Sequence, residues 1–222
     1  MRGRFITFEG GEGAGKSTQI KKLADRLNAA KLRTLVTREP GGSPGAEIMR
    51  HLVLSGMGKL LGPEAETLLF AAARDDHIQS TIRPALAQGK WVISDRFIDS
   101  TRVYQGTLGE VDAKLIRGLE RLMVGEAMPD LTVILDLPAG VGLKRAAGRR
   151  GKGKADRFED EQLEFHNKLR EAYRRIAESE PQRCVLIDAD RAKKKIADEI
   201  WSIVNARLDP AAAPMSFEDA HP

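Results

Sequence analysis

The chain has 222 residues, 41% of them hydrophobic and 31% charged, a composition that excludes a wholly disordered protein and suits one compact domain. Its single cysteine excludes an intramolecular disulfide, and no apolar run reaches the roughly 20 residues that span a bilayer, so we expect a cytoplasmic protein with no membrane partner. The net charge of +4 does not by itself distinguish a nucleic-acid partner from a phosphorylated ligand.

Short apolar runs alternate with helical patterns along the chain. The predicted strands are 5–8, 35–37, 91–94, 131–135 and 184–187, and the predicted helices are about 17–30, 44–55, 64–88, 98–125, 138–148, 159–178 and 192–207. The strands are apolar throughout and too far apart for hairpins, which predicts a five-stranded parallel sheet joined by helical crossovers. The fold class is therefore α/β, with a single three-layered domain at 1–208 and a flexible tail at 209–222.

A phosphate-binding loop follows the first predicted strand. Residues 10–17 have the pattern G-x-x-x-x-G-K-[ST], and an amphipathic helix begins directly after them. Glycines let backbone N–H groups turn toward a phosphate, and Lys16 can reach the β- and γ-phosphates of ATP while Ser17 binds Mg²⁺. The predicted nucleotide-binding residues are Gly10, Gly11, Glu12, Gly13, Ala14, Gly15, Lys16, Ser17 and Thr18.

The phosphate-binding loop alone does not define the reaction. A GTPase would carry N-K-x-D, but the Asn-Lys pair at 167–168 is followed by Leu-Arg, and Asp136 is a weak candidate for the acid of a motor ATPase. Asp95 and Arg96 follow a predicted strand at the sheet edge where such folds bind ligands. We expect Asp95 to bind Mg²⁺ or orient an arginine, and Arg96 to bind a second phosphate.

Further motifs resemble those of the bacterial thymidylate kinases, which are P-loop nucleoside monophosphate kinases. The motifs are Glu9-Gly10 to Ser17-Thr18, Thr37-Arg38-Glu39-Pro40-Gly41-Gly42, Leu69-Phe70-Ala71-Ala72-Ala73-Arg74, Asp95-Arg96-Phe97, Ser100-Thr101, Tyr104-Gln105-Gly106 and Asp156-Arg157-Phe158-Glu159. The similarity runs from Arg4 to about Leu208. It implies a P-loop NTPase fold, transfer of the γ-phosphoryl group of ATP to dTMP, and a homodimer formed through helices such as 64–88.

The resemblance also assigns residues to the acceptor's base and sugar. Phe70 and Arg74, four residues apart on one helix face, correspond to residues that stack on thymine and hydrogen-bond its carbonyl oxygen. Thr101 corresponds to a residue at the pyrimidine edge, and Tyr104 to a ring that lies under the sugar and crowds a 2′-hydroxyl. Gln105 is expected to contact the substrate beside it.

Arginines are the candidates for binding the acceptor's phosphate. Arg96 is the first choice, Arg38 the second and Arg50 the third, because guanidinium groups both bind and orient a dianion. The segment 39–42 is expected to form a rigid turn that fixes Arg38, and Pro40 is a candidate for a cis peptide bond.

Glu12 occupies a loop position that is neutral in many P-loops. In the family such an acid contacts the acceptor's sugar hydroxyl or a neighbouring arginine, and members without an arginine in this loop take a transition-state arginine from a lid. The basic segment at about 145–157 is the expected lid, with a mobile glycine-rich loop at 148–156. Arg149 is the favoured arginine, and Arg145, Arg150 and Arg157 are its alternatives.

The catalytic residues are therefore expected to be Lys16, Asp95, Arg96 and Arg149, with Ser17 and Asp95 as ligands of Mg²⁺. The alternatives are another P-loop small-molecule or nucleoside monophosphate kinase, a regulatory P-loop ATPase, or a nucleic-acid binder that uses the basic loop. The last lacks the aromatic platforms such binding usually needs. Between Pro138 and Arg157 the net charge is +6, so the basic excess is concentrated around the expected lid and no nucleic-acid partner is expected.

Overall fold

A five-stranded parallel sheet forms the centre of the protein. The computed structural model describes residues 2–150, 158 and 161–210. The strands are β1 (Phe5–Gly10), β2 (Thr34–Arg38), β3 (Trp91–Asp95), β4 (Leu131–Asp136) and β5 (Cys184–Asp188), in the order β2-β3-β1-β4-β5. Each strand contains its predicted apolar run, which confirms the α/β class and the parallel sheet.

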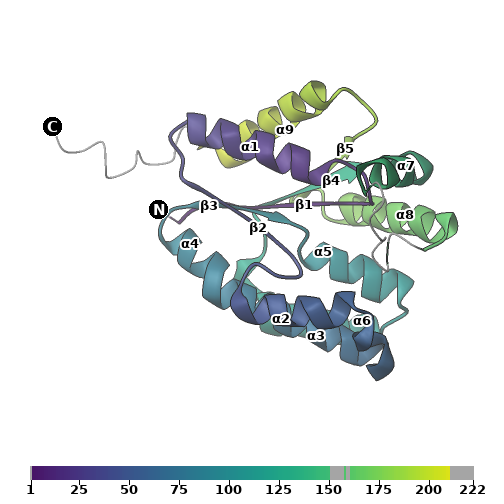
Figure 1. Ribbon diagram of the computed structural model, residues 1–222. Helices are drawn as coiled ribbons and strands as arrows, with labels where there is room; N and C mark the ends of the chain where they lie inside the picture. Colours follow the sequence, from purple (N-terminus) through teal and green to yellow (C-terminus); the bar gives the residue numbers. More distant parts are fainter. Residues whose placement is uncertain (1, 151–157, 159–160, 211–222) are drawn as a thin grey trace.

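Helices cover both faces of this sheet (Figure 1). On one face lie α1 (Lys16–Ala29) and α9 (Lys193–Leu208), and on the other lie α4 (Arg83–Ala87), α5 (Ile98–Thr101) and α8 (Leu163–Ser179). Farther from the sheet are α2 (Pro44–Leu54), α3 (Pro63–His77) and α6 (Ala113–Leu119), while α7 (Ala139–Arg150) follows β4. The three-layer arrangement is as predicted.

The side chains of β1 alternate between the two faces, as the period of a strand requires. Ile6 and Phe8 are fully buried in the core formed with α1 and α9. Phe5 packs in the core on the opposite face, and Glu9, four residues later, points to that same face, where its carboxylate accepts hydrogen bonds from Ser100 and Tyr173. The alternation of side chains along β1 therefore buries the acidic side chain of Glu9 between the sheet and the helices α5 and α8, directly before the phosphate-binding loop.

The prediction of one helix over 98–125 is wrong. Helix α5 continues as a π-helical segment, Arg102–Leu108, but the chain then leaves helical geometry and α6 begins at Ala113. Glu110 has a φ of 55°, and Asp112 caps α6 by accepting a hydrogen bond from the backbone N–H of Lys114 at 2.7 Å. The apolar periodicity continues across this break, which explains why it predicted a single helix.

The predicted lid differs from the structure at its start. Helix α7 continues to Arg150, so residues 148–150 are helical rather than part of a glycine-rich loop. The remaining lid residues, 151–157, and the expected tail from 211 onward lie outside the described residues. Within the described ranges, no helix is long and apolar enough to cross a membrane.

Candidate active site

The strand order brings the ends of β1 and β3 together. Phe8 pairs with Asp95, so the phosphate-binding loop after β1 faces Asp95 and Arg96 at the carboxyl edge of the sheet. A cavity of about 220 Å³ opens at this edge. Its lining includes the predicted site residues Glu12, Gly13, Ala14, Gly15, Lys16, Ser17, Arg38, Arg50, Phe70, Arg74, Asp95, Arg96, Thr101, Tyr104, Gln105 and Arg149. Gly10, Gly11 and Thr18 adjoin this lining in the chain without being part of it.

The loop is closely packed around the Lys16 side chain. Gly13 has a φ of 67°, and a Cβ there would lie 2.0 Å from the carbonyl oxygen of Gly142, so only glycine fits. The Lys16 ammonium donates hydrogen bonds to the carbonyl oxygens of Gly10 at 3.0 Å and Gly11 at 3.1 Å. Burial and the positive charge of Arg96 lower the pKa of Lys16. The ammonium is therefore held over the loop by backbone carbonyls.

Ser17 and Asp95 form an oxygen pair at the start of α1. The Ser17 hydroxyl donates a hydrogen bond to Asp95 Oδ2 at 3.2 Å. Hydroxyl and carboxylate oxygens suit Mg²⁺, which retains several waters and needs few protein ligands. Among the described residues, no group of three or more His, Cys, Asp or Glu side chains could hold a metal ion. The donor set at Ser17 and Asp95 thus fits a magnesium ion shared with phosphates.

Arg96 is a buried and closely held cation. Its φ is 70°, and its guanidinium donates to Glu12 Oε1 at 2.6 Å and to the hydroxyls of Ser100 and Tyr173, each at 3.3 Å. It also lies 5.2 Å from the centre of the Tyr104 ring. Burial alone would raise the pKa of Glu12, but Arg96, with further positive charges nearby, holds that pKa below its usual value. The acid in the loop thus has the arginine partner that the resemblance implied.

A second buried arginine lies at the other end of the cavity. Arg74 donates from Nε to Glu39 Oε2 at 2.7 Å, and from its terminal nitrogens to Thr101 Oγ1 at 3.0 Å and the Phe97 carbonyl oxygen at 3.2 Å. Glu39 is also 3.0 Å from His77 Nδ1. These contacts fix the plane of the guanidinium, and the remaining N–H groups are available to a ligand.

The other predicted substrate contacts surround these two arginines. Phe70 is 9% exposed and lines the cavity, as do Tyr104 and the buried Gln105. Arg38 bonds Glu47 at 2.9 Å, and Arg50 donates to the Pro40 carbonyl oxygen at 2.6 Å. The peptide bond between Glu39 and Pro40 is cis, which confirms that expectation.

Of the four arginines expected in the lid, the structure places Arg149 at the cavity. Arg149 lies on α7, lines the cavity, and its charge helps to lower the pKa of Glu12, after the effects of burial, Arg96 and Lys16. Arg145 instead pairs with Asp190 at 2.8 Å. The side chain of Arg150 and all of Arg157 lie outside the described residues.

Asp136, the candidate acid for a motor ATPase, serves another purpose. It ends β4 on the face toward α8, where Arg170 contacts both of its carboxylate oxygens at 2.6 and 2.8 Å. Arg174 adds a further contact at 3.2 Å. A carboxylate neutralised in this way is poorly suited to holding a metal ion or activating water.

Sequence reasoning missed three residues that support this site: Glu9, His77 and Tyr173. Glu9 belongs to the motif Glu9-Gly10 that precedes the loop. His77 lies three residues after Arg74 on one helix, so helical spacing could have indicated that it shares a face with Arg74, where both contact Glu39. Tyr173 is fully buried, more than 70 residues along the chain from Arg96, and its sequence pattern is that of an ordinary core residue.

A phosphate-binding loop facing an acid–arginine pair, with a buried arginine at the far end of the same cavity, defines a P-loop kinase that binds a small acceptor. A family model described as thymidylate kinase matches residues 8–200. The chain belongs to the thymidylate kinase family.

Individual relatives agree with this assignment. The thymidylate kinase of Bradyrhizobium diazoefficiens is 70% identical over 212 residues, covering 96% of this chain and 93% of the relative. The thymidylate kinase of Nitrobacter winogradskyi is 66% identical over 213 residues, with coverage of 96% and 93%. The crystal structure of thymidylate kinase from Ehrlichia chaffeensis has a TM-score of 0.73 and 32% identity, and covers 92% of this chain and 100% of its own. This similarity confirms the predicted P-loop NTPase fold.

Proposed function

We propose that this cavity is where the protein transfers the γ-phosphoryl group of ATP to dTMP, giving ADP and dTDP. The observation that carries this assignment is the continuity of one cavity, in which Lys16 and Ser17 face Arg96 and the pocket of Phe70 and Arg74 extends beyond. A donor triphosphate and an acceptor monophosphate can therefore meet between Lys16 and Arg96, with the acceptor's base beside Phe70 and Arg74. Positioning of this kind is the main requirement of phosphoryl transfer.

Each predicted residue has a role in this proposal. The loop from Gly10 to Thr18, with Lys16, binds the phosphates of ATP. Arg96 binds the phosphate of dTMP, with Arg38 and Arg50 as further cations that line the cavity. Arg149 approaches the transferred group from α7.

Ser17 and Asp95 would hold Mg²⁺, because they supply two adjacent hard oxygen donors beside Lys16. When bound, the metal ion supplies charge neutralisation at the phosphate oxygens. Glu12 keeps Arg96 in place and remains ionised, because the surrounding cations lower its pKa.

The base would lie between Phe70 and the polar groups beside it. Phe70 offers an aromatic face, and Arg74 donates hydrogen bonds, which a carbonyl oxygen at position 4 of thymine accepts but the amino group of cytosine does not. Thr101, Tyr104 and Gln105 line the same part of the cavity and would contact the pyrimidine edge and the sugar.

An acceptor panel tests the proposal directly. ADP release is measured with ATP, Mg²⁺ and each of dTMP, dUMP, UMP, CMP, AMP and GMP, and we expect turnover with dTMP to exceed that with every other acceptor. Turnover with a purine monophosphate alone would overturn the acceptor assignment. ATP consumption at full rate without any acceptor would instead indicate a regulatory ATPase.

Arg74→Ala should raise the KM for dTMP by about 100-fold while the KM for ATP changes less than about threefold, because a charged hydrogen bond is worth about 1.5–3 kcal/mol. Arg74 contacts Glu39 and Thr101 at the end of the cavity away from Lys16. Steady-state kinetics with each substrate varied in turn measures the two KM values. An equal rise in both would count against base recognition by Arg74.

We infer that the protein forms a homodimer through α2, α3 and two short helical segments, Met57–Leu61 and Glu120–Val124. Large apolar side chains are exposed there: Ile48 (68%), Met57 (55%), Leu60 (86%), Leu61 (64%), Leu68 (49%) and Leu122 (75%). An apolar surface of this kind is typical of a protein interface. Light scattering coupled to size-exclusion chromatography should give twice the chain mass, and Leu60→Glu should shift the protein to a monomer.

A further inference from the structure

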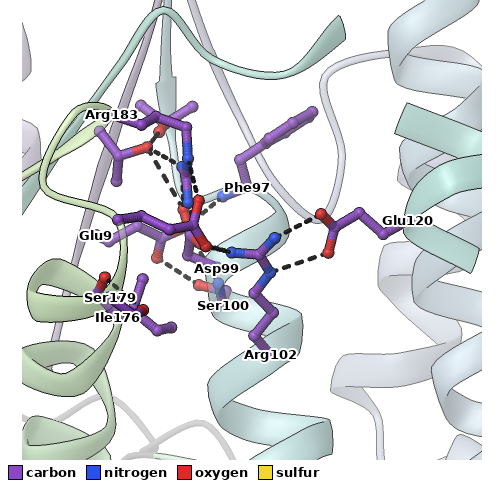
Figure 2. Close-up of polar contacts among 12 residues, drawn as sticks. Glu9, Phe97, Asp99, Ser100, Arg102, Glu120, Ile176, Ser179 and Arg183 are labelled. Atoms are coloured by element: carbon purple, nitrogen blue, oxygen red, sulfur yellow. Dashed lines mark hydrogen bonds and ion pairs between the residues drawn. The ribbon is translucent and has the colours of Figure 1, made fainter. Parts of the chain in front are cut away.

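Glu9 is a fully buried carboxylate directly before the phosphate-binding loop, and the reaction described above does not use it. Its Oε1 accepts hydrogen bonds from the backbone N–H groups of Phe97 at 2.8 Å and Ser100 at 3.2 Å. Its Oε2 accepts from the Ser100 hydroxyl at 2.7 Å and the Tyr173 hydroxyl at 2.9 Å. Figure 2 shows the Glu9 side chain among Phe97, Asp99 and Ser100. One carboxylate thus joins β1, the start of α5 and α8.

The same two hydroxyls contact Arg96. A terminal nitrogen of Arg96 lies 3.3 Å from Ser100 Oγ and 3.3 Å from the Tyr173 oxygen. Each hydroxyl has one proton to donate, and an ionised Glu9 accepts both. Both hydroxyl oxygens then present lone pairs to the guanidinium, so the proton positions of two hydroxyls depend on the charge of Glu9.

We propose that Glu9 is a positioning residue for phosphoryl transfer, whose ionised carboxylate orients the hydroxyls of Ser100 and Tyr173 as acceptors that hold Arg96 against the acceptor's phosphate. A protonated Glu9 instead donates to one of these hydroxyls, whose own proton then turns to the other hydroxyl, since the two oxygens lie 3.0 Å apart. Each hydroxyl oxygen then has one lone pair left for Arg96 instead of two, and Arg96 loses the attraction of the negative charge on Glu9. This role rests on the proposed function of Arg96, and it concerns a residue that itself touches neither substrate.

Charged groups from every neighbouring element act on Glu9. Burial and the carboxylate of Asp99 on α5 raise the pKa of Glu9 to about 7, against the opposing charge of Arg96 and the hydrogen bonds from Ser100 and Phe97. The other ionisable groups that face it are Tyr173 on α8, Tyr104, and Lys16 on α1.

Asp99 is itself held by two arginines (Figure 2). Arg183 contacts its two carboxylate oxygens at 2.7 and 2.8 Å, and Arg102 contacts one of them at 3.1 Å. Asp99 has no contact with the hydroxyls that join Glu9 to Arg96. It therefore provides a matched control, since it is equally buried and only one residue from Ser100.

Glu9→Gln tests the proposal because glutamine imitates the protonated acid in shape and carries an N–H₂ group where two hydroxyls need an acceptor. At about pH 8 we expect kcat to fall about 10- to 100-fold, the size of effect expected when a catalytic group is slightly misplaced, with the KM for ATP changed less than twofold. The ratio of wild-type kcat to Glu9→Gln kcat should approach one as the pH falls well below 7, since wild-type Glu9 is then protonated too. Taking the ratio cancels the ionisation of the acceptor's own phosphate, whose second pKa is about 6.

Two further variants complete the design. Asp99→Asn should keep a kcat within about threefold of wild type at pH 8, because loss of the Asp99 charge lowers the pKa of Glu9 and leaves Glu9 ionised at that pH. It should nevertheless melt at a lower temperature, because a broken buried ion pair destabilises the fold. Tyr173→Phe should lower kcat severalfold in the wild-type background and have little further effect in Glu9→Gln, since the two residues act through one contact.

Two results would overturn the role of Glu9. One is a ratio of wild-type kcat to Glu9→Gln kcat near one at about pH 8. The other is a large ratio that stays constant from about pH 5.5 to 8. If Glu9→Gln does not fold, as circular dichroism would show, Tyr173→Phe decides: an unchanged kcat contradicts the proposal. Failure of the proposed function gives a different result, because wild-type enzyme would then transfer no phosphoryl group to dTMP at any pH.

Discussion

Arg96→Ala is expected to lower kcat for phosphoryl transfer by about 10³-fold or more, the range found when an arginine that stabilises a transferring phosphoryl group is lost. Arg96 is buried and held by Glu12, Ser100 and Tyr173, so its guanidinium requires little reorganisation when the acceptor binds. Removing it also leaves the Glu12 carboxylate beside the ATP phosphates without its ion-pair partner. Loss of attraction and gain of repulsion therefore act together.

Two variants separate this effect from a general loss of charge. Arg96→Lys keeps one positive charge but cannot donate a bidentate pair of hydrogen bonds, so we expect a kcat between those of wild type and Arg96→Ala. Arg26→Ala removes a partly exposed arginine that pairs with Asp198 between α1 and α9, far from the cavity, and should leave kcat unchanged. Rapid-quench measurement of dTDP formation gives these rates. A turnover near wild type for Arg96→Ala would show that another cation binds the acceptor's phosphate.

The sheet and the phosphate-binding loop could be predicted because their signals are local. Buried parallel strands are continuous apolar runs, and the loop's residues are fixed by the need to wrap backbone N–H groups around a phosphate. The break at 109–112 could not be predicted in the same way, because the apolar period continues through it and only the backbone at Glu110 and the cap at Asp112 interrupt the helix. The predicted start of the lid loop was wrong because Gly148 suggested a loop, whereas Gly148 lies within helix α7.

The supporting residues of the site were hidden because their partners lie far apart in the chain. Glu9 meets Tyr173 only because β1 and α8 pack on each other, and Glu39 meets His77 only because β2 ends beside α3. Each is a polar residue at a position that a sequence pattern treats as core or turn. Contacts of this kind depend on tertiary packing, which the periodicity of apolar residues along the sequence does not indicate.

Lys16→Ala is the most direct test of ATP binding at the phosphate-binding loop. We expect kcat to fall about 10³-fold, because Lys16 is the cation placed over the loop and its loss removes charge stabilisation from the transferring phosphoryl group. Binding of dTMP, measured by titration calorimetry in the absence of ATP, should stay within about twofold of wild type, since Phe70, Arg74 and Arg96 are unchanged.

Lys21→Ala is the matched control, because Lys21 is an exposed lysine on the same helix, five residues farther from the phosphate-binding loop. It should leave both kcat and dTMP binding unchanged. If Lys16→Ala weakened dTMP binding as much as it lowered kcat, the two ends of the cavity would not act independently. If instead it retained the wild-type kcat, the ATP phosphates could not lie in the loop between Gly10 and Ser17.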